Sequence, residues 1–141
     1  MANDSSDFLR SMSIATSGLR AQAGRMRVIS ENIANADSTA ATAGGDPYRR
    51  KVPTFTSALD RAVDAKVVSL GKVVPDQSAF RIKYDPSNPA ADASGNVKYP
   101  NVNPLVEMTD MREAQRSYEA NINVITATRR MISRTIDILK A

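Results

Sequence analysis

Residues 8–36 read FLRSMSIATSGLRAQAGRMRVISENIANA, and this stretch decides the fold because its apolar residues recur at helical spacing. The intervals alternate between four and three residues, which is the pattern of a heptad seam. The seam positions are Phe8, Met12, Ala15, Leu19, Gln22, Met26, Ile29 and Ile33, of which Gln22 alone is polar. We predict a helix about 38 Å long over these residues, with Asp4, Ser5 or Ser6 as its N-cap.

A second heptad pattern occupies the C-terminal part of the chain. Its apolar positions recur every seven residues, at Met111, Tyr118, Ile125, Ile132 and Leu139. Asn103 followed by Pro104 has the chemistry of an N-cap and a first helical position, so we predict a helix of about 55 Å from there to Lys140. Such a helix cannot bury its seam alone. We therefore predict an antiparallel, coiled-coil-like pair with the N-terminal helix.

The region between the two seams has a different character. All seven prolines lie between residues 47 and 104, and proline is unfavourable inside helices. Residues 55–66 fit a short helix and an extended arm equally well. Residues 66–74, 80–84 and 97–99 have β-branched or alternating character and predict a small antiparallel sheet of three strands. Residues 85–96, DPSNPAADASGN, have the composition of turns.

These patterns together predict a mainly α fold with a small β region. The predicted parts are an N-terminal heptad helix over residues 1–36, a loop and an irregular three-strand middle over 37–104, and a C-terminal heptad helix over 105–141.

The composition of the chain narrows the possible functions. Its 141 residues fit one domain. Cysteine and histidine are both absent, so thiol nucleophiles, disulfides and imidazole chemistry are excluded and we expect no cofactor or metal site. The sequence contains no apolar run of about 18 residues, so we predict no transmembrane helix. The N-terminus lacks the pattern of a cleavable secretory signal. The net charge is +4, and the excess of cations falls within residues 47–104.

Two loops in the middle invite a functional interpretation. Gly44-Gly45 lacks the strand and the spacing of a phosphate loop, so we interpret it as a turn. Tyr48-Arg49-Arg50-Lys51 has the residue types that bind nucleic-acid phosphates and stack on bases. We favour instead a solvated basic turn or a contact with an acidic neighbouring subunit, because no nucleic-acid-binding module accompanies the segment. A small basic nucleic-acid-binding protein remains the alternative.

Carboxylates and asparagines form the other candidate sites. Glu107, Asp110 and Glu113 share one helical face, as in a carboxylate enzyme acting on cell-wall glycan, but a pair of helices offers no evident cleft for a buried acid. We interpret them as solvated charges near a helix N-terminus, where negative charge is favourable. Asn32 and Asn35 fit two roles, a C-terminal helix cap or an amide that bridges to neighbouring backbone.

Several motifs occur in the order that is typical of one protein family. Asn32-Ile33-Ala34-Asn35-Ala36 ends the N-terminal seam, and Gly44-Gly45-Asp46-Pro47-Tyr48-Arg49-Arg50-Lys51 follows it. Tyr99-Pro100-Asn101-Val102-Asn103, Glu107-Met108 and Arg116-Ser117-Tyr118-Glu119-Ala120-Asn121 come later. On these motifs nearly the whole chain resembles the rod and hook family of bacterial flagellar axial proteins, and within it the FlgC-type proximal rod proteins.

The resemblance implies a structural subunit of the flagellar basal-body rod, not an enzyme. Such subunits assemble by helix packing into a tubular drive shaft that transmits torque from motor to hook. The implied partners are other rod proteins, further copies of the same chain, MS-ring and rod-base export components, and the flagellar type III export apparatus. Nucleic-acid binding and membrane insertion are not implied. The implied location is a rod that spans the periplasm, reached by export without a cleavable signal.

The resemblance also implies roles for individual residues. The two seams are the expected surfaces of subunit packing. The expected motif and assembly contacts are Asn32, Asn35, Tyr48, Arg49, Arg50, Lys51, Tyr99, Asn101, Asn103, Glu107, Arg116, Tyr118 and Asn121.

Overall fold

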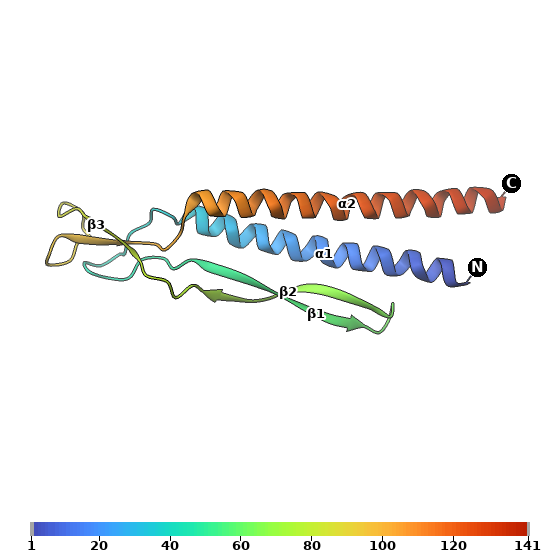
Figure 1. Ribbon diagram of the computed structural model, residues 1–141, viewed down its shortest axis with the longest axis horizontal. Helices are drawn as coiled ribbons and strands as arrows, with labels where there is room; N and C mark the ends of the chain where they lie inside the picture. The colour runs from blue at the N-terminus through green and yellow to red at the C-terminus, as the bar shows by residue number, and fades with distance from the viewer. Residues whose placement is uncertain (1, 141) are drawn as a thin grey trace. The chain divides into compact units, whose positions relative to one another are not determined.

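The computed structural model describes residues 2–140, and the side chains of these residues except 2–5 and 139. It contains two long helices and four strands (Figure 1). In chain order they are α1 (Ala2–Ala34), β1 (Lys51–Asp60), β2 (Ala65–Pro75), β3 (Arg81–Tyr84), β4 (Asn96–Tyr99) and α2 (Pro104–Lys140). No helix within the described range combines the length and the apolar character needed to cross a bilayer.

The helix ends follow local chemistry in two places and depart from our prediction in a third. At the start of α2, Asn103 Oδ1 accepts a hydrogen bond from Leu105 N at 3.1 Å, as an N-cap should. At the end of α1, Asn35 N donates to Glu31 O at 3.1 Å and closes the last turn. The N-cap prediction for Asp4–Ser6 is wrong, because α1 already includes Ala2. Residues 2–6 contain neither glycine nor proline, and an aspartate is favourable in a first turn.

The three-strand sheet predicted for the middle is also wrong. The strands form two separate two-stranded sheets, β1 with β2 and β3 with β4. A turn at residues 61–64, with Asp64 at φ 48° and Asp60 Oδ1 accepting from Ala62 N at 3.0 Å, reverses the chain between β1 and β2. Residues 55–60 therefore belong to an extended arm, and Gly71 does not break the strand that we predicted over 66–74.

By its contacts the chain divides into two compact units. The first unit contains the described residues up to Met26, Thr54–Lys72 and the described residues from Glu113 onward. The second contains Arg27–Pro53 and Val73–Arg112. The two long helices and the hairpin β1–β2 each contribute residues to both units.

In the first unit the two helices are antiparallel. Gly18 faces Asn121, and a Cβ on that glycine would lie 2.9 Å from the amide nitrogen. Farther along, Arg25 Nη2 lies 3.6 Å from Glu113 Oε2. Alanines at positions 15, 21, 65 and 114 are buried, together with Thr128. Small side chains thus allow the backbones of this unit to approach closely.

The hairpin covers another side of α1 within the first unit. Arg10 Nε donates to Val63 O at 3.0 Å, and Val68 N donates to Ser17 Oγ at 3.2 Å. A Cβ added to Gly24 would lie 2.8 Å from Leu70 Cδ2, so the glycine permits close contact there. Gln22, the polar member of the seam, has a buried Oε1 with no hydrogen-bond partner among the described atoms.

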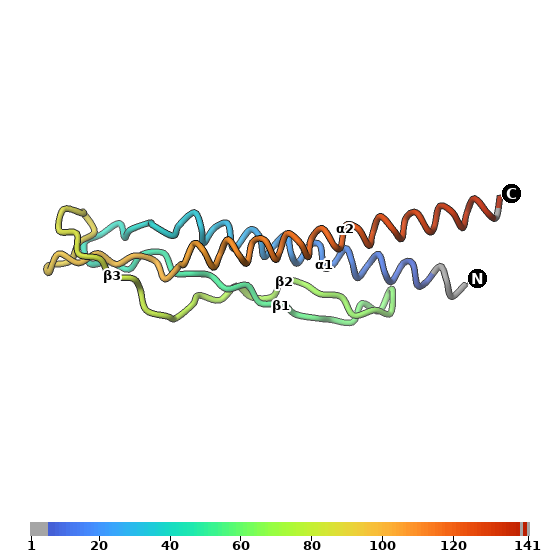
Figure 2. Tube along the Cα trace, turned by 45° about the horizontal axis from the view of Figure 1, so that its top comes forward, coloured from blue at the N-terminus to red at the C-terminus, as the bar shows by residue number. Residues whose placement is uncertain are grey.

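The second unit contains the sheet β3–β4 and the loops around it. Arg81 is opposite Tyr99 and Tyr84 is opposite Asn96. Figure 2 shows residues 85–95 as a folded-back loop between the two strands. Asp92 Oδ1 accepts hydrogen bonds from Ser94 N at 2.8 Å and from Asn96 N at 2.9 Å, and Gly95 takes φ 79°. The turn prediction for residues 85–96 is confirmed except at Asn96, with which β4 begins.

Candidate functional site

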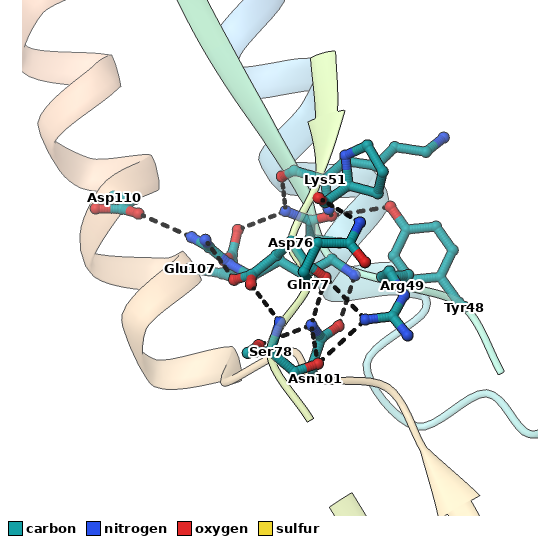
Figure 3. A network of polar contacts seen from close by, with 12 residues as sticks. Tyr48, Arg49, Lys51, Asp76, Gln77, Ser78, Asn101, Glu107 and Asp110 are labelled. Atoms are coloured by element: carbon teal, nitrogen blue, oxygen red, sulfur yellow. Dashed lines mark hydrogen bonds and ion pairs between the residues drawn. The ribbon is translucent and has the colours of Figure 1, made fainter. Parts of the chain in front are cut away.

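Figure 3 shows a network of polar contacts in the second unit. Asn32, which is 1% exposed, belongs to this network. Asn32 Oδ1 accepts hydrogen bonds from Tyr48 Oη at 2.8 Å and from Lys51 N at 2.9 Å. Its Nδ2 donates to Lys51 O at 2.8 Å and to Glu107 Oε2 at 3.0 Å. These four bonds use both donors and both acceptor sites of the amide. Asn32 therefore joins the last turns of α1 to the start of β1 and the start of α2.

The charged centre of this network is the pair of Arg50 and Glu107. Glu107 is 1% exposed, and its Oε1 accepts a hydrogen bond from Arg50 Nε at 2.6 Å. Asp76 and Asp110 lie 3.6 and 3.8 Å from the same guanidinium. Burial lowers the pKa of Arg50, but the hydrogen bond and the charges of the three carboxylates outweigh it, so the net pKa is raised. Because a buried carboxylate is costly without partners, Glu107 depends on Arg50 and Asn32.

Asn101 fixes the segment that follows β2. Its Oδ1 accepts a hydrogen bond from Arg50 N at 2.8 Å, and its Nδ2 donates to Asp76 O at 3.0 Å and to Ser78 Oγ at 2.8 Å. The carboxylate of Asp76 in turn accepts a hydrogen bond from Ser78 N at 2.9 Å. Hydrogen bonds from Ser78, and then the Arg50 charge, lower the pKa of Asp76. The two segments that flank the hairpin are thereby held together.

The three adjacent cations point to three different partners. Arg49 donates to the carbonyls of Asp76 and Ser78 at 3.0 and 3.1 Å and stacks 4.2 Å from the centre of the Phe80 ring. Arg50 binds Glu107, as described. Lys51 forms an ion pair with Glu31, and its Nζ lies 5.6 Å from the centre of the Tyr48 ring. The segment is therefore bound within the chain and does not form a solvated basic turn.

Tyr48 lies beside an open groove of about 790 Å³ in the second unit. Burial, and then the charges of Glu31 and Glu107, raise the pKa of the Tyr48 hydroxyl to about 12. Glu31, the one carboxylate that lines the groove, is bound to Lys51. No group of three or more potential metal ligands occurs among the described residues. The chemistry of this region is thus that of hydrogen bonding and charge pairing.

The structure brings together seven of the residues that the sequence singled out. They are Asn32, Tyr48, Arg49, Arg50, Lys51, Asn101 and Glu107. The interpretation of Glu107 as a solvated charge is wrong, because tertiary contacts bury it. Asn32 bridges backbone within its own chain, and Asn35 takes the alternative role by closing α1, where its Nδ2 donates to Glu31 O at 2.8 Å.

Other predicted residues lie outside the network. Asn103 caps α2, and Tyr99 lies in β4. Arg116, Tyr118 and Asn121 belong to the first unit. The side chain of Leu139 lies outside those that the structure describes.

Sequence reasoning missed Asp76 and Ser78 as members of the network. The signal available was the segment Asp76-Gln77-Ser78, in which an aspartate oxygen accepts from the backbone two residues later. This pattern predicts the local turn and gives no indication that Arg50 and Asn101 meet it.

Comparison with known proteins agrees with the family that the motifs indicate. A family model described as "Flagella basal body rod protein" matches residues 12–41, and one described as "Flagellar basal body rod FlgEFG protein C-terminal" matches residues 93–138. A flagellar basal-body rod protein FlgC of Agrobacterium fabrum is 56% identical over 128 residues, which cover 91% of this chain and 92% of the relative. The chain belongs to the FlgC family of flagellar basal-body rod proteins.

More distant FlgC proteins also match along most of their length. The protein of Bacillus subtilis is 39% identical, over 92% of this chain and 97% of its own. The protein of Salmonella typhimurium is 38% identical, over 92% of this chain and 96% of its own. The chain is therefore a structural subunit of the basal-body rod and not an enzyme, and it assembles with other rod components and with itself. The nucleic-acid-binding alternative has no support in these relatives.

Proposed function

We propose that this FlgC-family chain bears load in a rod that spans the periplasm, with the Asn32 network as its rigid joint. The observation that carries the proposal is the burial of Asn32 and Glu107, each 1% exposed, with hydrogen bonds to each other and to the start of β1. The bonds join segments that are 19 and 75 residues apart in sequence. When the rod turns under load, a force on the end of α1, on β1 or on α2 would be distributed over all three through these bonds.

We further propose that the two helical seams pack against neighbouring subunits, as do the motif residues outside the network, such as Arg116. In a single chain Met12, Leu19, Ile125 and Ile132 are only half-buried, which leaves apolar surface for a neighbour to cover. Ile29 is already buried within the chain. In this proposal residues 1–36 and 105–141 supply the helical packing, and residues 37–104 supply the joint and the β arms.

Export through the flagellar type III apparatus, without a cleavable signal, is the route that we propose. The proposed contacts at the base of the rod are MS-ring and rod-base export components. Support comes from the FlgC relatives, whose names place them in the basal-body rod.

The role of the joint can be tested in cells that carry Glu107→Ala in place of the wild-type chain. Basal bodies are extracted from these cells with detergent and examined for intact rods. Glu113→Ala is the matched control, since Glu113 also pairs with an arginine but has a side chain that is 66% exposed. We expect both variants to be exported, and the Glu107 variant to give fewer intact rods and poor swimming in viscous medium. Normal rods and swimming with Glu107→Ala would refute the load-bearing role of the network.

A further inference from the structure

A second heptad seam runs along the exposed side of α2 in the first unit. Its positions are Ala120, Val124, Ala127, Met131, Arg134 and Ile138, at intervals of four and three residues. Val124, Met131 and Ile138 are 46, 48 and 76% exposed. The seam of α2 already described, here called the first seam, includes Ile125 and Ile132, with Asn121 and Thr128 beside them. Each of these four residues directly follows a position of the second seam. One residue corresponds to about 100° around a helix, so the second seam points away from α1.

The second seam has the geometry of a helix-packing surface. Its apolar positions recur every seven residues, and the alanines between them let a partner backbone approach closely. Within the first unit, the other exposed large apolar residues described on this helix are Ile122 and Ile136, and they lie on the opposite side of the first seam. The exposed apolar surface is therefore split into narrow stripes. A helix that lies on a lipid surface needs one broad apolar face instead.

Arginines line one edge of the second seam. Arg116 and Arg130 flank it and Arg134 belongs to it, and all three side chains are exposed. Among the described residues none of these arginines forms an ion pair, although Glu119 and Asp137 lie on the same helix. Glu119 and Asp137 lie three residues after Arg116 and Arg134 on the same edge, so the edge carries three cations and two carboxylates, a net charge of +1.

The distribution of charge between the two units indicates the kind of partner. The segments assigned to the first unit hold eleven cations and seven anions, a net charge of +4, whereas those of the second hold eight of each. A second copy that packed its own first unit against this seam would bring like charges together, which is unfavourable. A helix with carboxylates beside its apolar residues would pair with the arginines.

We propose that the second seam of α2 docks an acidic amphipathic helix of a different rod component. The proposal rests on the rod function given above, since it names the chemistry of one neighbour in that assembly. In coiled coils, charges that flank an apolar seam decide which helices pair. The arginine edge would therefore select a heterologous neighbour over another copy of this chain.

Two synthetic peptides of about 28 residues test the proposal with the full-length protein. Both carry leucine at the a and d positions; one has glutamate and the other lysine at e and g. Fluorescence anisotropy should show salt-sensitive binding of the acidic peptide to the wild-type chain and little binding of the basic one. The triple change Arg116→Glu, Arg130→Glu and Arg134→Glu should weaken binding of the acidic peptide at least about tenfold and should strengthen binding of the basic peptide.

Two further variants separate the seam from general charge effects. The triple change Arg61→Glu, Lys66→Glu and Lys72→Glu alters the net charge equally and in the same unit, and it should leave peptide binding unchanged. Met131→Asp should abolish binding of the acidic peptide. Circular dichroism of each variant verifies that the helices persist. Equal losses from the two triple changes would overturn the proposal, because they would show attraction to net charge alone.

Two other occupants of the second seam, a second copy of the chain and a membrane, would give different results. Sedimentation of the wild-type chain as an oligomer that Met131→Asp dissociates, without binding of the acidic peptide, would mean that a second copy occupies the seam. Flotation with phosphatidylserine vesicles, again without peptide binding, would mean that a membrane does. Each result overturns the proposal. Absence of the wild-type chain from purified basal bodies would instead refute the rod function and leave the peptide result standing.

Discussion

The two units of the chain are stabilised by different chemistry. In the first unit, buried alanines and Thr128 let helices and hairpin approach closely, and the contacts that cross between segments include few hydrogen bonds. In the second, a buried amide and a buried carboxylate bind each other and residues 48–51, so that three segments of the chain meet there. Close packing of small residues is sensitive to added volume, whereas a buried polar network is sensitive to the loss of any one member. This difference leads to opposite expectations for substitutions in the two units.

The largest effect is expected from removal of the buried carboxylate. Glu107→Ala leaves Arg50 Nε without its acceptor and Asn32 Nδ2 with Lys51 O as its remaining acceptor. We expect a loss of about 4 kcal/mol in the free energy of unfolding. Glu113→Ala, which breaks an exposed ion pair in the first unit, should cost less than about 1 kcal/mol. Urea titrations of both variants provide the comparison. Similar losses for the two would mean that the network contributes no more than a surface ion pair.

Added volume should damage the first unit. Ala114 is buried on α2, and replacement by leucine should cost about 2 kcal/mol through overpacking. Ala120→Leu is the control, because Ala120 is exposed on the same helix and the change should be nearly neutral. Hydrogen exchange should show that the loss of protection with Ala114→Leu is confined to the first unit. A loss spread evenly over both units would contradict the contrast between them.

Alkaline pH should weaken the network through Tyr48. Because its folded pKa is raised from 10 to about 12, the stability that it contributes is fully present below pH 10 and is lost as the pH rises toward 12. Tyr48→Phe removes a hydrogen bond to Asn32 and should cost about 1 kcal/mol below pH 10.

The difference in the free energy of unfolding between the wild type and Tyr48→Phe should then become smaller between pH 10 and 12. Denaturation curves at several pH values measure it. Tyr84→Phe serves as the control, since the Tyr84 side chain is exposed and should show no such dependence. A constant difference across this pH range would show that Tyr48 does not lose its bond on ionisation.

The smallest effect is expected at Arg10 in the first unit. Its side chain is 41% exposed, and its Nη2 lies 3.2 Å from Asp64 Oδ2. Arg10→Ala should cost about 0.5 kcal/mol and should speed hydrogen exchange mainly in the turn at residues 61–64. Salt at high concentration should reduce the difference, because exposed charges are screened. A loss comparable to that of Glu107→Ala would remove the proposed contrast between the two units.

The sequence alone predicted the features whose causes are local. Heptad spacing predicted both helices, Asn103-Pro104 predicted the start of α2, and the composition of residues 85–96 predicted their turns. Each of these signals acts within a few residues, through caps, turns and helical periodicity. Motifs read in order also led to the rod family, which the relatives confirm.

Tertiary structure alone decided which strands pair and which charges are buried. Strand-forming residues specify an extended backbone and not its partner, so two hairpin-like sheets replaced the predicted sheet of three. Arg50 meets Glu107 across 57 residues, and Asn32 meets it across 75. A carboxylate in the first turn of a helix is favourable in water by itself. Its burial becomes possible only when both Arg50 and Asn32 bind it. These contacts form only when distant segments fold together, and no local pattern in the sequence predicts that.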